Sequence, residues 1–214
     1  MSKIISVEKA ADIIKNDMSL MIGGFLKCGC PTLVTDELLK RDTKNLILIA
    51  NDTSFPDSDR GKLIAAKKIK KSIVSHIGTN PETGKQMHSG EMEVELVPQG
   101  TLAEIIRAGG AGLGGVLTPT GIGTVVEKGK QIIELSGKKY ILEESLKADV
   151  AIIYGSKVDS FGNVSFEGAT RNFNSLMPMA AKTVIVEADQ YIEGYLDPNE
   201  IVVPGIFIDY IVIK

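Results

Sequence analysis

Two amide side chains, rather than an obvious nucleophile, are the groups in this sequence whose placement suggests chemistry. Gln99 lies between a predicted strand at 92–97 and a predicted helix at 101–108. Asn51 follows another predicted strand, at 45–50. An amide N–H between the end of a strand and the positive end of a helix is well placed to stabilise a developing oxyanion. Two such amides would serve one pocket, although on the pattern alone the simpler explanation is that loop amides cap local backbone.

A glycine-rich segment, residues 23–31, connects a predicted strand to a helix that Pro31 opens. Open α/β sheets bind ligands at such connections, where glycines let backbone N–H groups approach an anion. Gly24 and Gly29 have the spacing of a phosphate-binding loop, but Cys30-Pro31 stands where that loop requires Lys-Ser/Thr. The sequence therefore argues against a P-loop nucleotide site. A tight turn that needs glycine for its geometry alone remains an open explanation.

A second glycine-rich run, residues 109–115, has the G-x-G-x-x-G spacing at Gly110, Gly112 and Gly115. A dinucleotide-binding fingerprint must connect a strand to a helix. This run instead follows a predicted helix, so we expect a helix C-terminus and a loop rather than a cofactor site.

Carboxylates and thiols are weaker candidates for catalysis. Glu91, Glu93 and Glu95 recur with a period of two, which places them on one face of a strand. A solvated strand face explains that pattern without chemistry. Cys28 and Cys30 have no histidine nearby in the sequence that would activate a thiol. The residues alone therefore identify no nucleophile.

Composition and charge exclude several functional classes. The 214 residues carry a net charge of −3, which argues against a nucleic-acid-binding protein. The basic run at 67–71 is typical of a solvated turn. Two cysteines and two widely spaced histidines offer no metal-binding pattern. We find no signal peptide and no apolar run of about 18 residues, so we expect a soluble, cytoplasmic chain without a membrane segment.

Predicted strands and helices alternate along the chain, which favours an α/β fold with an open, largely parallel sheet flanked by helices. We expect one domain, residues 1–214, with a small β excursion around 121–142 that contains a hairpin at 136–138. Thr101 and Glu104 have the spacing of a capping box at the start of one helix. The other predicted strands are 19–22, 69–77, 150–154 and 183–187, and the other predicted helices are 7–15, 31–39 and 173–181.

Four segments together resemble the signature of one enzyme family, the family I coenzyme A transferases, and in particular its alpha subunits. The segments are Asp17 with residues 20–25, Gly29 and Pro31, then residues 91–112, residues 118–124 and residues 169–174. Met18 departs from the family pattern, which usually has Gly or Asn there, but it occupies a turn. The resemblance covers essentially the whole chain. It implies an open α/β domain that helps to move CoA from an acyl-CoA to a free carboxylate.

The resemblance also implies a division of labour between two chains. A glutamate attacks the thioester in this family, and in two-subunit members it lies on the beta chain. None of Glu91, Glu93 and Glu95 would then be the nucleophile. The implied assembly has two alpha and two beta chains. The apolar stretch 201–213 is a candidate surface for the beta chain, although a buried terminal strand explains it equally well.

By the same resemblance, one loop would lie along CoA and two amides would line the acyl pocket. The loop residues are Gly23, Gly24, Phe25, Leu26, Lys27, Cys28 and Gly29, and the amides are Asn51 and Gln99. Coenzyme A would act as a substrate, and the resemblance implies no other cofactor. Residues 51–53 and 76–84 are similar to members that act on acetate, butyrate and acetoacetate.

Three alternatives compete with this interpretation. A sugar-phosphate isomerase would need an internal base and a phosphate loop in one chain. A non-catalytic ligand-binding subunit would need a basic or helical module for its partner, and the sequence shows neither. A CoA-ester hydrolase would use water in place of the acceptor carboxylate.

Overall fold

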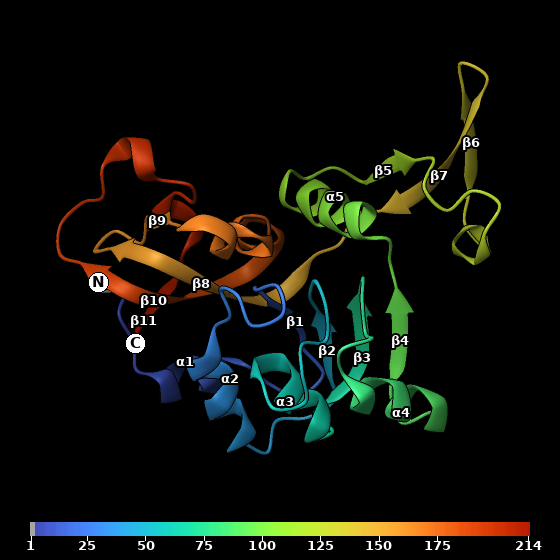
Figure 1. Ribbon diagram of the computed structural model, residues 1–214. Helices are drawn as coiled ribbons and strands as arrows, with labels where there is room; N and C mark the ends of the chain where they lie inside the picture. The colour runs from blue at the N-terminus through green and yellow to red at the C-terminus, as the bar shows by residue number, and fades with distance from the viewer. Residues whose placement is uncertain (1–2) are drawn as a thin grey trace.

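The computed structural model describes residues 3–214, and its main element is an eight-stranded sheet (Figure 1). The strands are β1 (Ser19–Ile22), β2 (Leu46–Ile49), β3 (Ile69–Val74), β4 (Glu93–Leu96), β8 (Ala148–Asp159), β9 (Val164–Ser165), β10 (Ala181–Ile192) and β11 (Tyr210–Ile213). Seven of them are parallel, in the order β11-β10-β8-β1-β2-β3-β4, and β9 pairs antiparallel with β8. The predicted open, largely parallel sheet is confirmed.

Alternation along the strands explains why helices cover both faces. In β1, Leu20 and Ile22 belong to one buried apolar cluster and Met21 to the other. The first cluster lies between the sheet and a layer of four helices, which Figure 1 shows on the lower side of the sheet. These helices are α1 (Val7–Ile13), α2 (Thr32–Leu39), α3 (Asp59–Ala65) and α4 (Pro81–Ser89). The sheet is therefore the middle layer of three.

The opposite layer holds α5 (Gln99–Gly110) and a series of short 3₁₀ turns. A continuous helix predicted at 173–181 is wrong, because the structure has two separate turns there, η3 (Phe173–Ser175) and η4 (Met177–Ala180). Pro178 explains the difference, since it lacks an N–H and its ring clashes with the preceding turn of an α-helix. Both turns still bury apolar side chains against the sheet.

The start of α5 also differs from the prediction. The helix begins at Gln99, two residues early, because the Leu102 N–H already donates to the Pro98 carbonyl at 2.8 Å. Thr101 is therefore inside the first turn, and the predicted capping box does not form. Within residues 3–214, no side chain caps this N-terminus, and Glu104 pairs with Arg107 at 2.7 Å instead. The glycine-rich run after it is the expected helix end and loop.

A three-stranded antiparallel sheet forms the predicted β excursion and projects away from the main sheet (Figure 1). Its strands are β5 (Gly115–Thr118), β6 (Ile132–Leu135) and β7 (Lys138–Glu144), in the order β5-β7-β6. Ser136 and Gly137 make the two-residue turn between β6 and β7, with φ of 51° and 72°. Two positive φ values match the twist of the flanking strands, so the predicted hairpin is confirmed.

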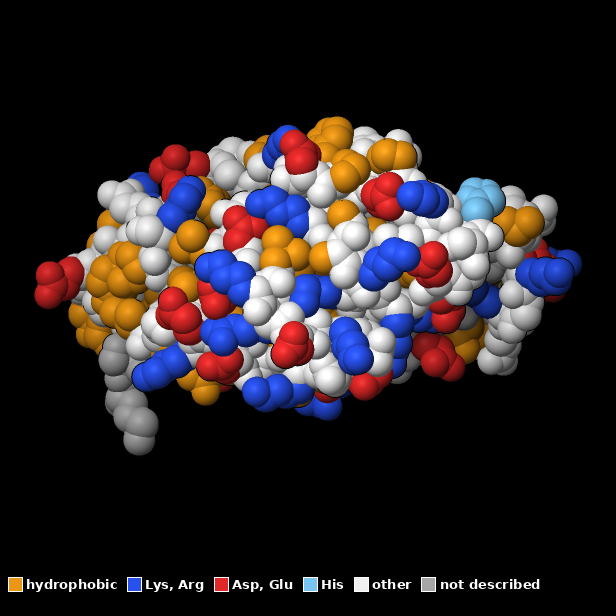
Figure 2. All heavy atoms as spheres, turned by 90° about the horizontal axis from the view of Figure 1, so that it is seen from below, with side chains coloured by type: hydrophobic (Ala, Val, Ile, Leu, Met, Phe, Trp, Pro, Cys, Tyr) orange, Lys and Arg blue, Asp and Glu red, His pale blue; other side chains and the backbone are white. Residues whose placement is uncertain are grey.

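Charged side chains of both signs are interspersed over the face formed by α1 to α4 (Figure 2). The basic run at 67–71 spans the turn from α3 to β3, as predicted. Lys71 reaches Glu93 and Glu95 of the adjacent strand at 2.9 Å each. The predicted solvated strand face is confirmed for Glu93 and Glu95, whereas Glu91 lies before β4 and pairs with Lys67 at 2.5 Å. Among residues 3–214, no helix is long and apolar enough to cross a membrane.

The apolar C-terminal stretch divides into two parts. β11 is a buried terminal strand, and its Ile211 is inaccessible to solvent. Ile206, by contrast, is 86% exposed. The buried-strand explanation is therefore correct for Ile211 and Val212, whereas Ile206 and Phe207 before the strand present apolar side chains to solvent.

Glu187 of β10 caps the N-terminus of α2. Its carboxylate accepts hydrogen bonds from the backbone N–H groups of Leu33 at 3.0 Å and Val34 at 2.7 Å. The residue is only 2% exposed. Burial raises the pKa of Glu187 to about 7, against the opposing effect of the two backbone donors. The charged form is favourable for the helix but costly to desolvate.

This pKa predicts a pH-dependent stability. The folded state binds the Glu187 proton more tightly than the unfolded state, whose carboxyl has a pKa near 4.5. The free energy of unfolding should therefore fall between about pH 5 and pH 8, by roughly 2–3 kcal/mol from this group. Glu187→Gln, which cannot titrate, should lose less over the same interval. Urea unfolding of the full chain at both pH values tests this, and an equal loss in both proteins would contradict it.

Candidate active site

The candidate site lies at the carboxyl edge of the sheet, where β1, β2 and β3 end side by side. Parallel strands bring their following loops to one edge, and open α/β sheets bind ligands there. The glycine-rich loop follows β1, the segment from Asn51 follows β2, and the segment from Ser75 follows β3. The N-terminus of α5 comes to the same edge after β4. The predicted strand 69–77 ends earlier, at Val74, which frees Ser75 for this edge.

A cavity of about 230 Å³ opens among these loops. Its lining residues are Phe25, Leu26, Asn51, Asp52, Ser75, His76, Thr79 and Gln99. The structure thus brings together the two amides that were predicted to converge, from strands separated along the chain. Four of the lining residues, Asp52, Ser75, His76 and Thr79, were not assigned to the site from the sequence. Asp52, His76 and Thr79 lie in the segments 51–53 and 76–84 that the family resemblance singled out, whereas Ser75 carried no such signal.

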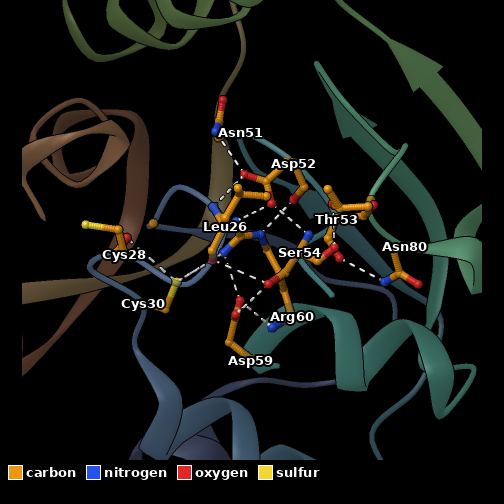
Figure 3. Close-up of polar contacts among 12 residues, drawn as sticks. Leu26, Cys28, Cys30, Asn51, Asp52, Thr53, Ser54, Asp59, Arg60 and Asn80 are labelled. Atoms are coloured by element: carbon orange, nitrogen blue, oxygen red, sulfur yellow. Dashed lines mark hydrogen bonds and ion pairs between the residues drawn. The ribbon is translucent and has the colours of Figure 1, made fainter. Parts of the chain in front are cut away.

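Arg60 of α3 is completely buried beneath this cavity. Its guanidinium pairs with Asp52 at 2.6 Å and with Asp59 at 2.8 Å, and its Nε donates to the Asp52 carbonyl oxygen at 2.7 Å. Figure 3 shows both carboxylates pointing toward the guanidinium. A charge buried in this way is tolerated only because it is paired and hydrogen-bonded.

Asp52 also holds the two loops that flank the cavity, through hydrogen bonds to its carboxylate. Its Oδ2 accepts hydrogen bonds from the Leu26 backbone N–H and from the Asn51 side-chain amide, both at 2.9 Å. Its Oδ1 accepts from the Ser54 N–H at 2.7 Å. One carboxylate held by Arg60 therefore fixes the glycine-rich loop and the orientation of the Asn51 amide (Figure 3).

Glycine is required in the loop after β1 for geometric reasons. Gly24 has a φ of +109°, and a Cβ there would lie 2.5 Å from the sulfur of Cys30. Gly29 has a φ of +64°, and its Cβ would lie 2.8 Å from a backbone oxygen at Thr170. The tight-turn explanation is thus confirmed at both positions. The N–H groups of Gly23, Gly24, Phe25, Leu26 and Cys28 already donate to acceptors within the chain.

Two asparagines from a distant segment hold the glycine-rich loop from its other side. Asn172 Oδ1 accepts from the Gly24 N–H at 3.1 Å, and Asn174 Nδ2 donates to the Gly29 carbonyl at 2.9 Å. Both asparagines belong to segment 169–174, which the family resemblance singled out. Sequence spacing gave no sign of this contact, because about 145 residues separate the partners.

The seven predicted CoA-contacting residues do not share one environment. Phe25, which is 48% exposed, and Leu26 line the cavity. Lys27 points away from it, since its ammonium pairs with Asp57 at 3.6 Å and lies 5.1 Å from the ring of Phe55. The glycines at 23, 24 and 29 are buried in the turn, and Cys28 is half-buried beside it.

Cys30, in the loop after β1, is a poor candidate for a nucleophile. Burial, reinforced by the negative charge of Asp59, raises the pKa of Cys30 to about 12, so its thiol stays protonated at neutral pH. In the part of the chain that the structure describes, no cluster of His, Cys, Asp and Glu is placed to hold a metal ion.

The Arg60 network predicts a large difference between two neighbouring lysine and arginine positions. Arg60→Met would leave two buried carboxylates unpaired and should lower the free energy of unfolding by about 3–5 kcal/mol. Lys62→Met, in the same helix, removes a partly exposed pair with Asp36 and should cost less than about 1 kcal/mol. Urea unfolding of the full chain measures both values. A similar loss in the free energy of unfolding for the two variants would show that the buried ion pairs do not stabilise the fold more than an exposed pair does.

Comparisons with known proteins agree with the resemblance. Residues 4–214 match the family model described as Coenzyme A transferase. The chain is 53% identical to the acetoacetyl-CoA:acetate/butyrate CoA transferase alpha subunit of Clostridium acetobutylicum, over 99% of this chain and 97% of that one. It is 49% identical to the acetate CoA-transferase subunit alpha of Escherichia coli K12, over 100% and 97%.

A solved structure shows the same fold. The acyl-CoA transferase of Escherichia coli O157:H7 superposes with a TM-score of 0.89 at 20% sequence identity. The match covers 100% of this chain and 47% of that longer chain. Taken with the family match over nearly every residue, these findings show that the chain belongs to the coenzyme A transferase family.

Proposed function

We propose that this chain is the alpha subunit of a short-chain acyl-CoA:carboxylate CoA-transferase acting on acetate, acetoacetate or butyrate. The observation that carries the proposal is the convergence of Asn51 and Gln99 on one small cavity in a chain of this family. Two relatives named for acetate, or for acetoacetyl-CoA with acetate and butyrate, support this choice of substrates.

The cavity suits a small acyl group on physical grounds. Its volume is about 230 Å³, below the usual range of sites for drug-sized ligands. Phe25 and Leu26 offer apolar contact to a short alkyl chain, while the amides of Asn51 and Gln99 offer neutral hydrogen-bond donors. A fixed positive charge would instead stabilise the ground-state carboxylates, so neutral donors favour the charge that develops during reaction.

The nucleophile is proposed to come from a beta chain. Asp52 is the one carboxylate among the described cavity-lining residues, and its oxygens are already committed to Arg60 and to backbone and amide donors. Glu93 and Glu95 are paired with Lys71 on the solvated strand face. Neither arrangement leaves a carboxylate free to attack a thioester.

The proposed reaction runs through successive acyl transfers. A partner glutamate attacks the thioester carbonyl, which releases CoA thiolate and leaves an acyl anhydride. The thiolate then attacks the glutamyl carbonyl, which releases the first acid and leaves a glutamyl-CoA thioester. The acceptor carboxylate reverses these two steps. Each attack develops an oxyanion that the amide N–H groups of Asn51 and Gln99 would receive.

Contacts to CoA outside the cavity are assigned to the glycine-rich loop, residues 23–29. The backbone of this loop is ordered by Asp52 on one side and by Asn172 and Asn174 on the other. Such preordering lets binding energy from CoA act at the reacting carbonyl rather than on loop ordering.

A partner chain in a two-alpha, two-beta assembly is part of the proposal. The relatives in Clostridium acetobutylicum and Escherichia coli are named as alpha subunits. This chain corresponds to 47% of the longer acyl-CoA transferase chain, which leaves room there for a second half. Exposed Ile206 is a candidate contact for the partner. Family membership also argues against the sugar-phosphate isomerase and ligand-binding alternatives.

The split site can be tested by reconstitution. CoA transfer from acetoacetyl-CoA to acetate should require both this chain and its beta partner, because only the partner would supply the nucleophile. Strong activity from this chain alone would contradict that division. Rapid hydrolysis of acetoacetyl-CoA by the pair, without transfer to any carboxylate, would instead identify a CoA-ester hydrolase.

The oxyanion role predicts a specific kinetic defect. Gln99→Ala in the reconstituted enzyme should lower kcat roughly a hundred- to thousandfold, because one transition-state donor is lost. Affinity for CoA should change far less, since the donor acts mainly on the reacting carbonyl. Gln190→Ala, which alters an exposed glutamine of β10, serves as the matched control. An unchanged kcat in Gln99→Ala would remove Gln99 from the acyl site.

A further inference from the structure

The hydroxyl group of Ser75 lies between the two amides of the candidate site. Ser75 is the first residue after β3, and it is half-buried at the cavity wall. Its Oγ is 2.7 Å from the backbone oxygen of Asn51 and 3.5 Å from the Asn51 side-chain oxygen. The same Oγ is hydrogen-bonded to Oε1 of Gln99. One small side chain thus contacts both proposed oxyanion donors.

A serine hydroxyl carries one proton, so Ser75 can donate a full hydrogen bond to only one of its neighbouring acceptors. Three acceptors lie within reach, which are the Asn51 backbone oxygen, the Asn51 side-chain oxygen and Gln99 Oε1. The backbone oxygen of Asn51 already accepts the Ser75 N–H at 3.0 Å. Gln99 Oε1 has no other donor among residues 3–214. Donation to Gln99 gives that oxygen its donor, while the Asn51 backbone oxygen keeps the Ser75 N–H. The Asn51 side-chain oxygen, at 3.5 Å, is farther from the hydroxyl than the Asn51 backbone oxygen.

This hydrogen bond determines how the Gln99 amide is presented. An amide is planar, so holding its oxygen also fixes the direction of its N–H₂ group. Within residues 3–214, Nε2 of Gln99 has no hydrogen-bond partner, so both of its protons remain available to a ligand. Without a fixed oxygen, the broad terminal torsion of glutamine would let the amide turn over and aim its carbonyl at the substrate.

We infer that Ser75 is a positioning residue that acts through Gln99, holding the amide with its N–H₂ group toward the acyl carbonyl. This inference rests on the proposed function of the site. The backbone of Ser75 is itself tied to Asn51 through its N–H, so removal of the hydroxyl leaves the strand pairing intact. Ser75 is therefore a residue whose substitution should alter catalysis without unfolding the chain.

A double-mutant cycle in the reconstituted enzyme tests this role. Ser75→Ala should lower kcat roughly tenfold, the size expected for one neutral hydrogen bond, with less than about a twofold change in KM for acetoacetyl-CoA. The double variant Ser75→Ala/Gln99→Ala should be no slower than Gln99→Ala, because nothing remains for Ser75 to position. Ser75→Thr, which keeps a hydroxyl, should restore most of the lost rate.

Thr79 provides a matched control on the same cavity wall. Its hydroxyl donates to the Ser54 backbone oxygen at 2.8 Å and does not contact Gln99. The fold-reduction in kcat of the double variant Thr79→Val/Gln99→Ala should therefore equal the product of the two single reductions.

Several outcomes would overturn the inference. A wild-type rate in Ser75→Ala would do so, as would full multiplication of the Ser75→Ala and Gln99→Ala effects. Multiplication would mean that Ser75 acts independently of the amide. If Gln99→Ala itself keeps full activity, the proposed acyl site fails and the inference fails with it. A defect in Gln99→Ala with none in Ser75→Ala would overturn the inference alone.

Discussion

The side chain of Arg60 is inaccessible to solvent, and the carboxyl edge of the sheet depends on how its charge is neutralised. A buried guanidinium must have its donors satisfied, and Asp52 and Asp59 do this together with the Asp52 backbone oxygen. If Asp52 moved, the buried guanidinium would lose a paired carboxylate. Asp52 is therefore a fixed hydrogen-bond acceptor for two loops. The order of the candidate site follows from this ion pair rather than from the strands alone.

Fixed loops are what the proposed use of neutral amides requires. Asn51 donates to Asp52 and Gln99 accepts from Ser75, so in the proposed reaction neither amide would need to reorganise when charge develops on a bound carbonyl. Among residues 3–214, Asp52 is the carboxylate that lines the cavity, and its oxygens are already hydrogen-bonded. A preorganised acceptor half that lacks a nucleophile is the arrangement expected of one subunit in a shared active site.

Sequence reasoning reached the fold and part of the site. The short apolar run of β1 (Ser19–Ile22), ended by two glycines, was predicted with its correct bounds because burial and turn signals coincide there. The continuous helix predicted at 173–181 was wrong because Pro178, which lies inside that range, divides it into two short turns. Arg60 could not be predicted, since an arginine is expected at the surface until tertiary structure pairs it. Ser75 was hidden inside the predicted strand 69–77, whereas the observed strand β3 ends one residue before it, at Val74.

The most direct test of this account is a crystal structure of the assembled enzyme trapped with a short-chain acyl-CoA. The account predicts the acyl carbonyl oxygen within about 3 Å of an amide nitrogen of Asn51 or Gln99. It also predicts the attacking glutamate on the partner chain and the Arg60 ion pairs intact. An acyl group bound away from this cavity, or a nucleophile supplied by this chain, would contradict it.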